Sequence, residues 1–109
     1  MPSSPYNQMW MMVMFDLPVG TAKERKKATA FRKGLLDLGF EMSQFSVYVR
    51  FCGDRQKTEP YVRKIKTLIP ENGSVTLLFF TDRQFSDIIN FSNRKRKKLK
   101  ENPAQLSLF

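Results

Sequence analysis

The sequence predicts an α+β sandwich in which two helices cover one face of a mainly antiparallel sheet. Short apolar runs, typical of strands, alternate with two longer segments whose apolar residues recur every three or four positions, which is typical of helices. The chain has 109 residues, enough for one packed core but not for two. Hydrophobic residues make up 41% of it and include ten Phe, which excludes wholesale disorder.

The first two elements are a buried strand and an amphipathic helix. The run Met9–Phe15 is apolar at every position, so both faces of this strand are expected to be buried. A helix is expected from about Ala22 to Leu38, because Thr21 and Glu24 form a capping-box pattern before it and Gly39 suits the position after its end. The apolar stripe of this helix consists of Ala28, Phe31, Leu35 and Leu38.

The middle of the chain predicts a long strand and a second helix. Residues 40–52 are expected to be extended, with a bend or bulge near Ser43–Gln44 that divides them. A second helix is expected to begin near Thr58–Pro60 and to end at Pro70. The long strand alternates from residue 45 onward, with Phe45, Val47, Val49 and Phe51 on one face and Ser46, Tyr48 and Arg50 on the other.

The remaining elements complete a ferredoxin-like sandwich. Ser74–Thr81 is a strand that is apolar on both faces, residues 81–86 are a short connector, and residues 87–91 are a weaker strand. This order of strands and helices is that of the ferredoxin-like fold, which we assign to residues 1–91 with a core from about residue 9. Residues 92–104 are expected to be a basic linker, and residues 105–109 a terminal strand or docking peptide.

One face of such a sheet has no helix over it. Because the first strand and the Ser74–Thr81 strand are apolar on both sides, that face needs a cover. We expect the cover to be a second copy of the chain, packed sheet to sheet about a two-fold axis. The alternative is that residues 105–109 fold back over part of the same face.

Composition restricts the possible chemistry and partners. The formal net charge of +9 favours a polyanionic partner, nucleic acid or an anionic membrane surface, and no amphipathic apolar face beside the basic run supports the membrane. Histidine is absent, which excludes His-based triads and His-ligated zinc. The single cysteine, Cys52, excludes a disulfide framework and fits a reducing compartment. With no targeting or membrane-spanning segment visible, we expect a cytoplasmic protein.

Basic residues are the candidates for contact with phosphates. Those at the start of the first helix lie where backbone N–H groups and the helix dipole also attract anions. The alternative for any one of them is an ordinary solvated helix face. The candidates are Lys23, Arg25, Lys26, Lys27, Arg32, Arg50 and Arg55, together with Arg94, Lys95, Arg96, Lys97 and Lys98.

Asp16 is the best single candidate for metal chemistry. A carboxylate at the end of a buried strand can offer a hard oxygen ligand to Mg²⁺. One carboxylate is a poor site by itself, but two Asp16 side chains related by a two-fold axis could share a metal. The alternative is an Asx-turn or a cap for the following segment. Nothing in the spacing of Glu41, Asp82 or Asp87 groups these residues with Asp16.

Several short motifs together resemble one family. Met14-Phe15-Asp16-Leu17-Pro18, Gly39-Phe40 and Gln44-Phe45-Ser46-Val47-Tyr48 occur in that order, followed by residues 74–91 with Thr81-Asp82-Arg83-Gln84-Phe85 inside them. In order and spacing they resemble the CRISPR-associated Cas-two family, and most closely the members that accompany type II systems. The resemblance covers about residues 9–91. Many members have Tyr before the Asp, so Phe15 lacks a hydroxyl that those members carry.

The resemblance implies a fold, partners and an activity. It implies a ferredoxin-like homodimer that bridges two dimers of the CRISPR integrase and holds the incoming DNA duplex during spacer acquisition. It also implies a Mg²⁺-dependent endonuclease that acts on RNA or DNA, with Asp16 at the metal-binding position of the family. A toxin-like ribonuclease is a third possibility, because the fold resembles that of some toxins.

The last five residues allow two interpretations. The alternation of Gln105, Leu106, Ser107, Leu108 and Phe109 suits a strand that adds to the sheet edge of the partner, as is common in the resembled family. The same five residues also resemble the docking pentapeptide of the bacterial sliding clamp. In both interpretations Gln105, Leu106, Leu108 and Phe109 contact the partner.

Overall fold

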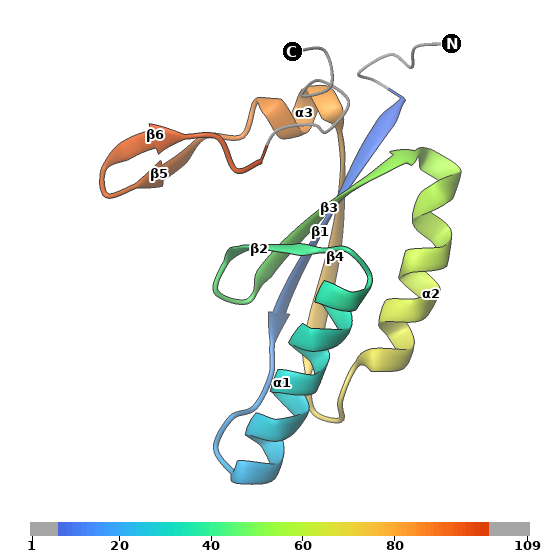
Figure 1. Ribbon diagram of the computed structural model, residues 1–109, viewed down its shortest axis with the longest axis vertical. Coiled ribbons are helices and arrows are strands. Elements are labelled where there is room, and N and C mark those ends of the chain that lie inside the picture. Colours follow the sequence, from blue (N-terminus) through green and yellow to red (C-terminus); the bar gives the residue numbers. More distant parts are fainter. Residues whose placement is uncertain (1–6, 101–109) are drawn as a thin grey trace.

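In the computed structural model, which describes residues 7–100, two helices cover one face of a four-stranded antiparallel sheet (Figure 1). The strand order is β2-β3-β1-β4, and all three pairings are antiparallel. Each helix connects two strands that have a third strand between them, which is the split β-α-β arrangement of the ferredoxin-like fold. The strands are β1 (Gln8–Asp16), β2 (Glu41–Gln44), β3 (Val47–Asp54) and β4 (Ser74–Thr81), and the covering helices are α1 (Ala22–Asp37) and α2 (Glu59–Leu68).

The main core lies between the sheet and these two helices. Alternate residues of β1 point to the helices. The predicted stripe of the first helix faces them, with Ala28, Phe31 and Leu35 buried and Leu38, at the helix end, partly buried against the same core. The aromatic rings of Phe15 and Phe31 meet edge to face, with their centroids 5.1 Å apart. The central members of this core are Met11, Val13, Phe15, Phe31, Leu35 and Ile65.

Both ends of α1 follow the sequence prediction. Thr21 Oγ1 accepts a hydrogen bond from the backbone N–H of Glu24 at 3.1 Å, and Glu24 Oε1 accepts one from the backbone N–H of Thr21 at 2.9 Å. At the other end, Gly39 adopts a φ of 86°, which favours glycine. The N–H groups of Gly39 and Phe40 donate to the carbonyls of Leu36 and Leu35, so the exposed end of the helix is capped.

The predicted irregularity near Ser43–Gln44 is present, because the register of the β2–β3 pair shifts between Met42 and Gln44. The extended segment divides just after it, where a tight reversal at Phe45–Ser46 pairs β2 with β3 as a hairpin. Ser46 has a φ of 66°, a conformation that a short polar residue tolerates in a turn. Phe45 therefore lies in the turn and not on a strand face, whereas the predicted alternation holds from Val47 onward.

The connector after β4 is a short helix, which the sequence analysis did not predict. Helix α3 (Asp82–Ser86) begins with a second capping box: Thr81 Oγ1 accepts a hydrogen bond from the backbone N–H of Gln84 at 3.1 Å, and Gln84 Oε1 accepts one from the backbone N–H of Thr81 at 2.9 Å. It lies on the face of the sheet opposite α1 and α2, where Phe85 stacks on Trp10 with the ring centroids 4.0 Å apart. The indole Nε1 of Trp10 also donates to Asp82 Oδ1 at 2.8 Å.

The chain itself thus covers half of the face that was expected to need a second copy. Around Trp10, Val49 and Phe85, the partly buried side chains of Ile88 and Leu99 complete a second core cluster. The other half stays open, and Met14 in the central strand is 43% exposed there. The expectation that both faces of the first strand are buried is therefore correct for one end of that strand only.

A two-stranded hairpin projects from the domain beyond α3 (Figure 1). It consists of β5 (Asn90–Ser92) and β6 (Lys95–Lys97), which pair only with each other. The weaker strand predicted over residues 87–91 is therefore shorter, begins later and lies outside the main sheet. The basic stretch that was expected to be a linker contains β6. The predicted contact residues Gln105, Leu106, Leu108 and Phe109 lie outside the described residues.

Candidate nucleic-acid interface

Asp16 ends β1 on the open face of the sheet. It shares that face with Met14, two residues earlier, and its partner across the strand pair is Ser74 of β4. Its side chain is exposed. The turn of the β2–β3 hairpin lies beside this strand end, because the backbone N–H of Phe15 donates to the carbonyl of Ser46 at 3.1 Å.

The other candidate carboxylates are engaged away from Asp16. Asp82 is buried against Trp10, Glu41 forms an ion pair with Lys100 at 3.2 Å, and Asp87 forms one with Arg83 at 3.4 Å. Within residues 7–100 no group of three His, Cys, Asp or Glu side chains is placed to hold a metal ion. One protomer therefore supplies a single carboxylate, which does not amount to a ligand set for Mg²⁺.

Four basic side chains gather at the first turns of α1, and all four are exposed. Arg25 is held there by a hydrogen bond from its Nη1 to the carbonyl of Val19 at 3.0 Å. This end of the helix also carries the partial positive charge of the backbone, so the site attracts anions. Its members are Lys23, Arg25, Lys26 and Lys27.

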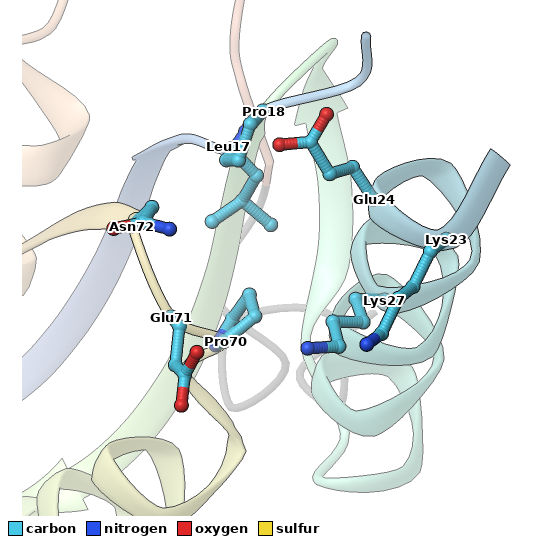
Figure 2. A pocket seen from close by; sticks show the side chains of 8 residues that line it. All are labelled: Leu17, Pro18, Lys23, Glu24, Lys27, Pro70, Glu71 and Asn72. Atoms are coloured by element: carbon cyan, nitrogen blue, oxygen red, sulfur yellow. The ribbon is translucent and has the colours of Figure 1, made fainter. Parts of the chain in front are cut away.

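A small pocket of about 130 Å³ opens beside this end of α1. Figure 2 shows Glu24 and Lys27 of α1 facing Leu17 and Pro70 across it. Asp16 does not line the pocket. Because acidic and basic side chains share its rim, it has no clear preference for an anion.

Two of the predicted phosphate-binding arginines are occupied inside the fold. Arg50 Nε donates to the carbonyl of Leu38 at 2.9 Å, and its guanidinium lies over the ring of Tyr61, 4.5 Å from the centroid. Arg32 is half-buried between the rings of Phe15 and Phe45. Arg50 therefore connects β3 to the end of α1 and to α2, and we leave it out of the candidate surface. Arg55, by contrast, is exposed in the 3₁₀ turn Arg55–Thr58.

Replacing Arg50 with methionine tests this structural assignment. The change removes a charge-assisted hydrogen bond to a carbonyl and a cation–π contact, so we expect the free energy of unfolding to fall by about 2 kcal/mol. DNA affinity should change little. The matched control is Arg55→Met, for which we expect less than about 0.5 kcal/mol of destabilisation. Urea unfolding followed by circular dichroism measures both, and equal stabilities of the two variants would contradict the assignment.

The β5–β6 hairpin forms a second basic site. All five basic residues that the sequence singled out in this region are exposed. Cross-strand register places Lys95 and Lys97 opposite Ser92 and Asn90, and Arg96 opposite Phe91, so basic side chains lie on both faces of the ribbon. The five are Arg94, Lys95, Arg96, Lys97 and Lys98.

The thiol of Cys52 is not a candidate nucleophile. It lies in the main core, and burial raises the pKa of the thiol, an effect that the nearby Arg50 charge only partly offsets. Because the thiolate is the reactive form, this cysteine is unreactive near neutral pH.

Sequence reasoning missed the position of Phe45, whose ring is 78% exposed beside Arg32. Alternation alone placed this residue on a strand face. The signal for a turn was weak, because Phe45-Ser46 lacks the Gly or Asn that commonly marks a two-residue hairpin.

None of the helices within the described part of the chain is both long enough and apolar enough to cross a bilayer.

Comparison with known proteins identifies the family of this chain. Residues 9–88 match the family model described as CRISPR associated protein Cas2. A protein of Paracidovorax avenae named CRISPR-associated endoribonuclease Cas2 is 48% identical over 104 residues, which cover 95% of this chain and 96% of that protein. Proteins of the same name are 43% identical in Flavobacterium psychrophilum, covering 95% of this chain and 90% of that protein, and 43% identical in Parvibaculum lavamentivorans, covering 93% and 100%. This chain is therefore a member of the Cas2 family of CRISPR-associated proteins.

Proposed function

We propose that this chain acts in spacer acquisition as a homodimeric scaffold that binds double-stranded DNA and bridges two dimers of the CRISPR integrase. The observation that carries the proposal is the contrast between two exposed basic sites and one isolated carboxylate. Cations of this kind contact phosphates without reading sequence. Such a surface suits a protein that holds a duplex of any sequence.

The open half of the sheet supports the dimer. Met14 lies exposed in the central strand, and its cross-strand neighbours on the same face are Val47 and Thr76. A two-fold partner packed on this half would bury Met14 and would bring the two Asp16 side chains toward each other. Because α1 packs on the opposite face of the sheet, the basic residues at its start would stay exposed in the dimer. The β5–β6 hairpin projects from the domain beyond α3 (Figure 1).

The backbone conformation at the tip of the β5–β6 hairpin supports contact between this hairpin and a polyanion. Asn93 and Arg94 occupy the two central positions of the turn, with φ angles of 54° and 65°. Asn tolerates this conformation, whereas Arg is strained in it, and Gly would be the more stable residue at the second position. A cation placed there at a cost in stability fits a tip that contacts a polyanion.

The second candidate function is a Mg²⁺-dependent endonuclease acting on RNA or DNA. The relatives named endoribonuclease favour it, as does the exposed position of Asp16 at the end of β1. Because one protomer supplies one carboxylate, the metal would have to lie between two protomers, with the Asp16 of each as a ligand. When bound, the metal would supply Lewis-acid stabilisation of a phosphodiester.

Replacing Asp16 with alanine separates the two functions. If the chain is a scaffold, spacer integration with purified integrase and a labelled duplex should proceed at a rate close to wild type. Any cleavage of RNA that requires Mg²⁺ should fall by about 10²-fold or more, because a metal ligand has been removed. Light scattering should give a mass of twice 12.8 kDa for both proteins.

The matched control is Asp37→Ala, which removes the same charge from an exposed position at the far end of α1. It should change neither integration nor cleavage. Loss of integration in a folded, dimeric Asp16→Ala protein would refute the scaffold proposal. Cleavage that survives both the substitution and EDTA would refute the nuclease proposal.

A further inference from the structure

We propose that Phe45 and Arg32 form a stacking site for one unpaired nucleobase of a nucleic-acid strand. The inference rests on the proposed function, which makes nucleic acid the ligand. It adds the place where one base binds and the condition that this base is unpaired. A duplex offers phosphates along its length, but only an unpaired end or loop offers the face of a base.

The ring of Phe45 is presented on a firmly held support. It lies in the two-residue turn between β2 and β3 and is 78% exposed, more than any other large hydrophobic side chain of the described residues. The turn is fixed to the central strand by the hydrogen bond from Phe15 N–H to the Ser46 carbonyl. An aromatic ring held in this way loses little conformational freedom when a second ring stacks on it.

The guanidinium of Arg32 lies beneath this ring. Its Cζ atom is 4.9 Å from the Phe45 centroid and 5.7 Å from the Phe15 centroid, so the cation has aromatic rings as its neighbours. The Nε atom of Arg32 is buried and has no hydrogen-bond partner. The cation covers one side of Phe45 and leaves the other side free for a planar ligand.

The position of the site argues against a purely apolar protein partner. Phe15 faces the helices, so Arg32 and the Phe45 ring above it lie on the helix side of the sheet. The proposed dimer surface is on the opposite side. An apolar partner would also have to bury a guanidinium without pairing its charge, which is costly.

A nucleotide offers both a planar ring for Phe45 and a negative charge for Arg32. Its base can stack on the free side of Phe45, and the negative charge of its phosphates offsets the nearby positive charge of Arg32. Arg25 lies seven residues earlier on the same side of α1, about 10 Å away along the helix, where a neighbouring phosphate can reach it. The site is at the same end of the sheet as Asp16, so a strand held here passes close to the candidate metal ligand.

The test compares ligands that share one duplex and differ in the tail attached to it. Fluorescence anisotropy at one fixed salt concentration measures the affinity for a blunt duplex, the same duplex with a thymine tail, the same duplex with an abasic tail, and a uridine RNA tail. We expect wild type to prefer the thymine tail to the abasic tail by about tenfold. Phe45→Ala should abolish this preference and leave blunt-duplex affinity unchanged. Comparison of the thymine and uridine tails shows whether DNA or RNA is the better source of the base.

Two further variants make the result specific. Phe45→Trp keeps an aromatic face and should keep the preference, whereas Phe79→Ala, which removes a 41% exposed ring at the opposite edge of the sheet, should not affect it. An equal preference in wild type and Phe45→Ala, or none in wild type, would overturn the stacking site. The same holds if Phe45→Ala halves the mass in solution and keeps the preference, because Phe45 would then be a protein contact. If wild type does not bind the blunt duplex, the scaffold proposal is refuted instead. The preference for a thymine strand over an abasic strand can still be measured on single strands.

Discussion

Replacing Trp10 with alanine will lower the free energy of unfolding by about 4 kcal/mol, the largest stability effect that we expect from a single substitution in this protein. The indole is 3% exposed, stacks on Phe85 and meets Phe51 edge to face at 5.4 Å. Its removal leaves a cavity in the second core cluster and also leaves the buried carboxylate of Asp82 without its hydrogen-bond donor. Urea unfolding followed by far-UV circular dichroism measures the loss.

A second substitution of Trp10 separates the contributions of the ring and the hydrogen bond, and a substitution in the hairpin is the control. Trp10→Phe keeps an aromatic ring on Phe85 but removes the donor to Asp82, so it should cost about 1–3 kcal/mol, less than alanine. Phe91→Ala removes an exposed ring from the hairpin and should change stability by less than about 0.5 kcal/mol. If Trp10→Ala were as mild as Phe91→Ala, α3 would not be anchored to the sheet as described.

This anchor also bears on function, because α3 precedes the basic hairpin in the chain. Asp87 and Ile88 bond back to α3 through backbone N–H groups, and Ile88 packs in the Trp10 cluster. Beyond the hairpin, Leu99 packs in the same cluster. The hairpin is thus attached to the domain on both sides of its two strands through one group of contacts, so Trp10→Ala should also weaken DNA binding.

The parts of the fold that the sequence predicted well are those in which local and tertiary signals agree. In α1, the capping box at Thr21, the apolar stripe and Gly39 all point to the same helix, and the structure has it within one residue of the prediction. The bounds of β4 agree with the prediction because Gly73 and the capping residue Thr81 lie at its two ends. Helix α3 carried its own capping box, but five residues are too few for helical periodicity to show.

The candidate site was less predictable because exposure depends on tertiary contacts. The sequence cannot distinguish Arg50, which the fold uses to join β3 with α1 and α2, from Arg55, which points to solvent. Both are basic residues in the same stretch of the chain. The coverage of the open face by α3 likewise depended on Trp10 and Phe85 meeting across 75 residues of sequence. Asp16 was easier to place, since a polar residue that directly follows an apolar strand lies at the end of the sheet.

The largest functional effect that we expect comes from removing positive charge from β6. Replacing Lys95, Arg96 and Lys97 with glutamine takes three exposed cations from one strand. The slope of log affinity against log salt concentration falls by about 0.9 for each phosphate that the protein no longer neutralises. The slope should therefore fall by about three for each hairpin that touches the duplex. At 0.1 M salt the corresponding decrease in affinity is about 10²-fold or more.

A charge-matched variant on α2 makes this prediction specific to the hairpin. Arg63, Lys64 and Lys66 are also exposed, also comprise one arginine and two lysines, and lie on a helix that we leave out of the DNA surface. Their replacement with glutamine changes the net charge by the same amount, so long-range attraction to DNA falls equally in both variants. If the hairpin touches phosphates directly, only the β6 variant should lower the salt slope by about three, whereas the α2 variant should change it by less than about one. Equal slopes in a titration of labelled duplex between low and moderate salt would mean that the net charge of the domain, and not contact by the ribbon, accounts for binding.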